Sequence, residues 1–192
     1  AGLGGQIAWA LPSLAPDLTT AIVPVGAPHP LALRSLRARA LSGPALQYVS
    51  LRIPGLAERR LRSRSALEGL LRSWAGPHTR EALAEEAPYY AELLSRPGAA
   101  RSALEPLRNL VLSRAETAAL DKPVTVPVLS VQGELDPVQP AQAYARDTHH
   151  VAGNLRQVTI HRSGHFPQEE TPAGFVRALL PFLADVAPPA SA

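Results

Sequence analysis

Hydrophobic and polar positions divide the chain into three zones with different periodicities. Residues 1–30 combine a helical pattern, from Gly5 to about Leu14, with the continuous apolar run TTAIVPVGAP. Such a run is typical of a parallel strand that is covered on both faces. The first zone therefore predicts a helix followed by a buried strand.

Residues 31–120 lack strand signals and carry apolar positions at helical spacing. The pattern is clearest in ALEGLLRSWA, REALAEEAPYYAELL and SALEPLRNLVL, and prolines interrupt it between these segments. Trp74, Tyr89 and Tyr90 follow the helical spacing, so we expect them in the core of this zone. The pattern predicts a helical insertion.

Residues 121–192 return to alternating strands and helices. The segments VPVLSVQGE and RQVTIHRS predict strands, a helix is expected near residues 140–150, and PAGFVRALLPFLADV predicts a closing helix. Strands that alternate with helices indicate a parallel sheet. We therefore expect an α/β fold with one core and an inserted helical region.

The composition is that of an ordinary globular protein, with 192 residues, 46% hydrophobic and 18% charged. The chain has no cysteine, which excludes disulfides and cysteine-type metal sites. We expect neither a metal nor a cofactor. No signal peptide opens the chain and no apolar run is long enough to span a membrane. We therefore expect a cytoplasmic protein without a membrane partner.

The net charge of +3 raises the question of nucleic-acid binding. Arginine is concentrated in residues 31–120, and Lys122 is the only lysine of the sequence. Nucleic-acid sites usually add interleaved aromatic residues or a known module, and neither is present here. We expect no nucleic-acid partner.

Two motifs follow the late strands: VQGELDPVQP, which contains Asp136, and IHRSGHFPQEETP, which contains His165. The carboxyl ends of parallel strands meet in one crevice, so these side chains can converge. An acid followed by a histidine suits the two supporting members of a hydrolytic triad. Taken singly, Asp136 also fits a turn cap before Pro137, and His165 fits a solvated loop histidine. Their shared context favours an acid–base pair.

With these motifs in this order, the chain resembles the C-terminal two-thirds of α/β-hydrolase-fold enzymes, especially epoxide hydrolases and haloalkane dehalogenases. GLGGQIAWAL is similar to the helix after the nucleophile elbow, and VGAPHP to the strand end before the cap. RIPGLAERRL and YYAELLSRPGAARSALEPLRNL are similar to cap segments of epoxide hydrolases. The resemblance implies the last three parallel strands with flanking helices in residues 1–30 and 121–192, and a helical cap in residues 31–120. It assigns the acid role to Asp136 and the base role to His165.

The elbow of that family reads GxDxGG or GxSxGG. Aligning GLGG with this pattern places Gly2 at the nucleophile position and the Leu3 N–H in the oxyanion hole. Glycine has no side chain that could attack a substrate. Gly2 itself therefore cannot form a covalent intermediate.

Epoxide hydrolases of this group also use two cap tyrosines that donate hydrogen bonds to the leaving oxygen. The resemblance places Gln47 at the first tyrosine position, beside Tyr48, and Leu107 at the second, beside Arg108. The leucine side chain cannot donate a hydrogen bond, which weakens the hypothesis of an epoxide hydrolase. We expect Gln47, Tyr48 and Leu107 near the substrate and Phe166 in an apolar wall of the pocket.

These expectations favour a hydrolase that acts on a small, mostly apolar ester or epoxide. An N-terminal hydrolase chain or a preceding segment would complete the sheet and the nucleophile, and without it we expect residues 1–192 to be poorly soluble. Two alternatives stay open. One is a lyase or cyclase without a covalent step that uses His165 as base, and the other is a non-catalytic ligand-binding protein.

Overall fold

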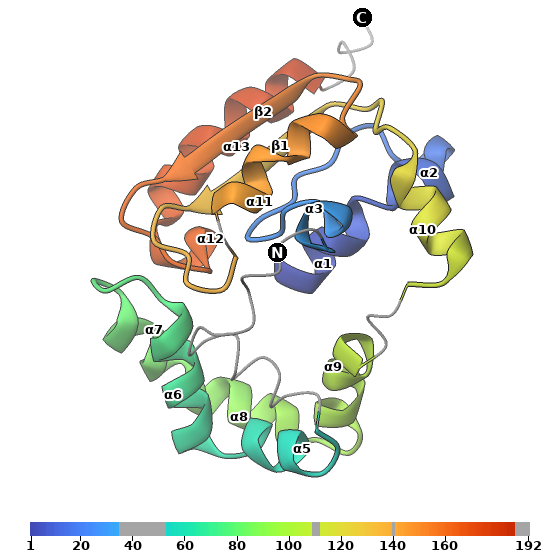
Figure 1. The fold of residues 1–192 in the computed structure, drawn as a ribbon. Helices are drawn as coiled ribbons and strands as arrows, with labels where there is room; N and C mark the ends of the chain where they lie inside the picture. Colours follow the sequence, from blue (N-terminus) through green and yellow to red (C-terminus); the bar gives the residue numbers. More distant parts are fainter. Residues whose placement is uncertain (35–52, 109–111, 140, 187–192) are drawn as a thin grey trace, which may run out of the picture.

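The computed structural model describes residues 1–34, 53–108, 112–139 and 141–186, whose elements are labelled in Figure 1. The first helices are α1 (Gly2–Ala8), α2 (Leu11–Leu14), the 3-10 helix η1 (Pro16–Leu18) and α3 (Pro30–Arg34). The middle helices are α5 (Leu56–Leu61), α6 (Arg64–Trp74), α7 (Arg80–Glu85), α8 (Ala87–Ser95), α9 (Ala99–Arg108) and α10 (Arg114–Asp121). The last elements are β1 (Val128–Gly133), α11 (Ala141–Ala145), the 3-10 helix η3 (Asp147–His150), β2 (Leu155–Ile160), α12 (Pro167–Glu170) and α13 (Pro172–Val186).

The sheet is parallel, as the sequence predicts. β1 pairs with β2 in the register that sets Val128 opposite Leu155. On the other side of β1 lie residues 22–26, which make two isolated parallel bridges at Ile22 and Val25. The Pro24 carbonyl accepts a hydrogen bond from the Val131 N–H at 2.9 Å. Because proline has no N–H to return to the ladder, the expected third strand is interrupted here.

Side chains of β1 alternate between the two faces of the sheet. Val128 packs in a buried cluster with Trp9 and Leu120, whereas Leu129 and Val131 pack in a second cluster with Phe182 of α13. Figure 1 shows α13 behind the strands and α11 in front of them. β1 is therefore buried on both faces, as expected for a parallel strand between helices.

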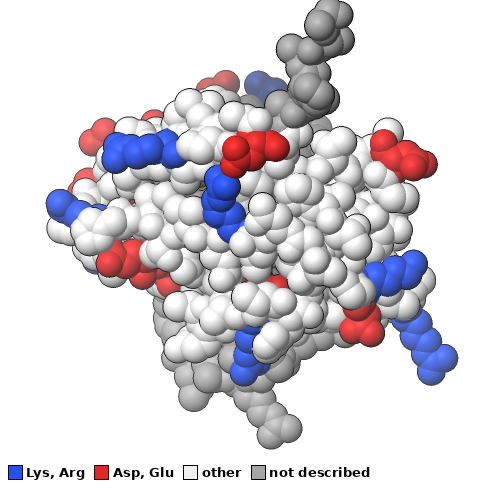
Figure 2. Space-filling view, turned by 90° about the horizontal axis from the view of Figure 1, so that it is seen from above, with Lys and Arg blue, Asp and Glu red and all other residues white. Residues whose placement is uncertain are grey.

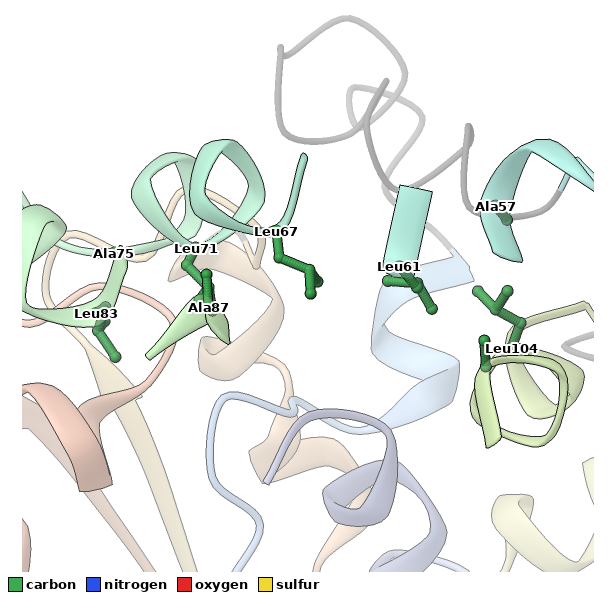
Figure 3. Packing of buried hydrophobic residues seen from close by; sticks show 9 residues of the cluster. Ala57, Leu61, Leu67, Leu71, Ala75, Leu83, Ala87 and Leu104 are labelled. Carbon is green, nitrogen blue, oxygen red and sulfur yellow. The ribbon is translucent and has the colours of Figure 1, made fainter. Parts of the chain in front are cut away.

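Helices α5–α9 form a separate layer below the sheet in Figure 1. Their apolar side chains meet in a cluster of their own, which Figure 3 shows from close by. Its buried members are Ala57, Leu61, Leu67, Leu71, Ala75, Leu83, Ala87, Ala100 and Leu104. Helix α10 packs instead against α2 and α3, and its Leu120 joins the Trp9 cluster. The boundaries of core and cap at residues 30 and 120 stay a prediction.

The surface carries scattered charges. On the face seen in Figure 2, basic and acidic side chains are interspersed among uncharged ones. Among the helices of the described residues, none combines the length and the apolar character that a membrane crossing requires.

A buried polar cluster ties the loop after residues 22–26 to β1. The Asp147 carboxylate accepts the His29 N–H and the Ser130 hydroxyl, each at 2.8 Å, and the His29 ring stacks on His150 at 3.9 Å between centroids. Burial raises the pKa of Asp147 to about 6, although both hydrogen bonds oppose the shift. Burial, with a smaller contribution from His150, lowers the pKa of His29 to about 3. Both groups therefore have an energetic cost of ionising inside the fold.

The Asp147→Asn variant tests this cost through the pH dependence of stability. Because the pKa of Asp147 is raised on folding, its carboxylate destabilises the fold increasingly as the pH rises from about 4 to about 6. The variant removes this term, so its stability relative to the parent should rise over that window, by at most about 3 kcal/mol, and level off above it. Urea unfolding from pH 4 to pH 7 measures the difference. A constant difference across the window would contradict the assignment.

Candidate active site

The acid and base loops approach each other through backbone that leaves no room for side chains. A Cβ on Gly133, at the end of β1, would lie 1.8 Å from the Gly164 carbonyl oxygen. A Cβ on Gly164 would lie 2.3 Å from the Gly76 nitrogen, in the loop between α6 and α7. Glycine is required at this meeting point because any side chain would displace the neighbouring backbone. The glycines of both motifs thus bring Asp136 and His165 together.

Asp136 and His165 form a buried hydrogen-bonded pair. The His165 Nδ1 lies 3.0 Å from Oδ2 and 3.2 Å from Oδ1 of Asp136. The Asp136 side chain is 2% exposed and the His165 side chain 8%. A carboxylate beside Nδ1 favours the tautomer with its proton on that nitrogen, which leaves the Nε2 lone pair free to accept a proton.

The Asp136 carboxylate is itself held by its own loop. Its Oδ1 accepts the backbone N–H groups of Val138 at 2.8 Å and Gln139 at 3.0 Å. The Tyr144 hydroxyl of α11 lies 3.4 Å from Oδ2. These contacts satisfy the turn-cap interpretation of Asp136 and also orient the carboxylate toward His165, so the structure combines both interpretations.

Position 2 faces the free nitrogen of His165. Gly2 has the left-handed φ of +51°, and a Cβ built on it would lie 4.0 Å from the His165 Nε2. Its N–H donates to the Val25 carbonyl at 2.8 Å, which fixes the start of α1 against residues 22–26. Strained backbone conformations of this kind often occur at active sites. The structure thus brings positions 2, 136 and 165 together.

A pocket of about 310 Å³ opens beside this group. Its described lining residues are Ala1, Gly2, Leu3, Gln6, Trp74, Ala103, Val138, Gln139, His165, Phe166, Gln168 and Glu169. Leu3 and Phe166 both line this pocket, while the oxyanion role expected of the Leu3 N–H stays a prediction. Glu169 is the one ionisable carboxylate in this set, and neither lysine nor arginine occurs among these lining residues.

The other expected substrate contacts are described only in part. Gln47 and Tyr48 lie outside the described residues. Leu107 lies in α9, one helical turn after the pocket residue Ala103. Their expected proximity to substrate stays a prediction.

Trp74 is a pocket residue that sequence reasoning placed only in the core. It packs against the cluster of α5–α9, but its ring also meets the His165 ring edge to face, with centroids 5.5 Å apart. The backbone carbonyl of Trp74 accepts a hydrogen bond from the backbone N–H of His165 at 2.9 Å. Helical spacing predicts that Trp74 faces inward. The same spacing does not predict that the end of α6 reaches the loop of His165.

Comparisons with known proteins concern the family and the fold. The model of the alpha/beta hydrolase family matches residues 2–178, and no significant match to a curated protein sequence is found. A protein from Salmonella enterica described as a "Putative Acyltransferase" is structurally similar, with a TM-score of 0.81 and 19% identity. The similarity covers 96% of this chain and 62% of that one.

Two further solved structures are of hydrolases. The meta-cleavage product hydrolase from Pseudomonas fluorescens IP01 has a TM-score of 0.67 and 18% identity, over 96% of this chain and 63% of that one. The 2-hydroxy-6-oxo-6-phenylhexa-2,4-dienoate hydrolase from Rhodococcus sp. strain RHA1 has a TM-score of 0.64 and 20% identity, over 94% of this chain and 61% of that one. This chain thus spans less than two thirds of each of these proteins. At these identities the similarity concerns the fold. Since the family model matches nearly the whole chain, the protein belongs to the alpha/beta hydrolase family.

Proposed function

We propose that the protein is a hydrolase in which His165 is the general base and Asp136 holds and stabilises its imidazole. The observation that carries this proposal is the buried Asp136–His165 pair, whose free nitrogen faces the left-handed backbone of Gly2. Hydrogen-bond distance between base and orienting acid is the geometry that general-base catalysis needs. The Leu3 N–H, directly after position 2, would stabilise the developing oxyanion.

Because Gly2 has no attacking group, two routes to hydrolysis are open. In the first, a nucleophile comes from an N-terminal hydrolase chain or a preceding segment, and His165 takes its proton. In the second, His165 Nε2 takes a proton from water, the water oxygen bonds to the electrophilic carbon, and the leaving oxygen receives that proton as its bond to carbon breaks. The second route also suits a lyase or cyclase, in which His165 removes a proton from the substrate itself.

The first route remains the leading candidate because the chain spans less than two thirds of its structural neighbours. Apolar side chains stay exposed along the first helices: Ile7 is 54%, Leu14 63% and Leu18 87% exposed. In the proposal, the strands of the partner chain or preceding segment pair beside residues 22–26 and cover these side chains.

A small, mostly apolar and uncharged ester is the substrate class that we favour. The pocket volume of about 310 Å³ is at the lower end for small-molecule sites. Glu169, one of the described lining residues, would repel a carboxylate. We therefore expect a substrate unlike the dienoate named for the Rhodococcus hydrolase. An epoxide is the weaker candidate because Leu107 occupies the position at which the resemblance to epoxide hydrolases expects a tyrosine.

A Gly2→Ser substitution tests the assignment of position 2. A hydroxyl on the Cβ that lies 4.0 Å from Nε2 comes within hydrogen-bonding reach of the base. The variant should gain covalent labelling at residue 2 by a fluorophosphonate probe. Gly2→Ala, which places a similar Cβ on the same left-handed backbone without a hydroxyl, is the matched control. Absence of labelling at Ser in a folded variant would contradict the assignment.

A His165→Ala substitution tests whether the site is catalytic. General-base catalysis typically contributes about 10²–10⁴-fold, so hydrolysis of a neutral p-nitrophenyl ester should fall by that factor. His161→Ala is the control, because the His161 side chain is 77% exposed and forms its ion pair with Glu134, away from the Asp136–His165 pair. An unchanged rate in His165→Ala would contradict the proposed base. Ligand binding without turnover in the parent would favour the non-catalytic alternative.

A further inference from the structure

The Glu170 carboxylate accepts four hydrogen bonds from two separate loops. Its Oε2 accepts the Gly164 N–H at 2.8 Å, the Gly76 N–H at 2.7 Å and the Thr79 hydroxyl at 2.6 Å. Its Oε1 accepts the Phe166 N–H at 2.9 Å. Both oxygens of the carboxylate therefore accept hydrogen bonds, and a group that accepts from four donors is held firmly in place.

The donors on one side flank the base. Gly164 and Phe166 are the neighbours of His165 in the chain, and the His165 N–H donates to the Trp74 carbonyl. Three consecutive N–H groups of the base loop are therefore bonded either to Glu170 or to the end of α6. This leaves the backbone that carries the imidazole little freedom to rotate.

The donors on the other side belong to the helical layer. Gly76 and Thr79 lie in the loop between α6 and α7, whose backbone also touches Gly164. Trp74, at the start of this loop, lines the pocket and contacts the His165 ring. A displacement of this loop would therefore move a pocket wall and the base together, or break the bonds to Glu170.

We infer that Glu170 is a positioning residue for His165: it joins the base loop to the α6–α7 loop and fixes Nε2 relative to Asp136 and position 2. Hydrogen bonds to a carboxylate are about twice as strong as neutral ones, which suits a link between segments about ninety residues apart in the sequence. This inference rests on the proposed function for its catalytic consequence, whereas the link between the loops stands on the contacts alone.

The Glu170→Gln variant tests the inference because it keeps the shape of the side chain but turns one acceptor into an NH₂ group. That group faces backbone N–H donors and cannot bond to them. A misplacement of a catalytic group by about 1 Å costs about 10²-fold, so kcat should fall by about 10- to 100-fold, with KM changed much less. Thr79→Val should give a smaller loss, and Thr79→Ser, which keeps the hydroxyl, should restore the parent kcat.

Hydrogen exchange supplies a readout that does not depend on turnover. Glu170→Gln should speed amide exchange at Gly164, Phe166 and Gly76 together, while the thermal midpoint shows that the fold persists. Glu85→Gln makes the same chemical change at an exposed position of α7 and should leave exchange and kcat unaltered.

The outcomes separate this inference from the proposed function. Faster exchange in both loops with a loss of kcat supports the positioning role. Parent-like kcat in Glu170→Gln, or faster exchange in only one loop, overturns it. If the parent shows no turnover, the proposed function fails, and the exchange result alone decides whether Glu170 joins the two loops.

Discussion

Three loops meet where their backbones leave no room for a Cβ, and the candidate site depends on this contact. Gly133 ends the strand that leads to Asp136, Gly164 precedes His165, and Gly76 belongs to the helical layer. Their close approach brings an acid, a base and a pocket wall from separate parts of the chain to one point. The polar groups then complete the arrangement: Asp136 bonds to the imidazole, and Glu170 bonds to the backbone on both sides of it.

The sequence predicts that Asp136 and His165 converge because their positions follow from the topology of the sheet. Both motifs come directly after strands in a segment where strands and helices alternate. Parallel strands end at the same edge of a sheet. The closing helix covers the predicted residues 172–186, and the described part of residues 31–120 contains the expected helices. The strand after α1 is predicted as continuous, but in the structure it forms only isolated bridges at Ile22 and Val25. The apolar pattern misses this interruption because it does not take account of the N–H that Pro24 lacks.

The roles of Trp74 and Glu170 lie beyond such patterns. Helical spacing places Trp74 inward but does not distinguish the core of the layer from the wall of a pocket. Gly76 and Thr79 lie about ninety positions before Glu170 in the sequence, and no periodicity links them to it. Tertiary contacts of this kind require the loops to be placed in space, which a single sequence does not provide.

In the proposed function, Gly2 would set the chemistry apart from that of a complete triad. Its backbone has a left-handed φ, and a Cβ built on it would lie 4.0 Å from the His165 Nε2, but glycine has no group that can attack. A base aimed at such a position can act on a nucleophile brought from another segment, on water or on the substrate. All three possibilities need the same state of His165, with Nδ1 bonded to Asp136 and Nε2 unprotonated.

Nitrogen NMR of the histidine side chains tests this state most directly, with the His165 signals assigned by their loss in a His165 variant. For the neutral imidazole, the account predicts a single tautomer with the proton on Nδ1 and an unprotonated Nε2. A proton resident on Nε2, or rapid averaging between the two tautomers, would contradict it.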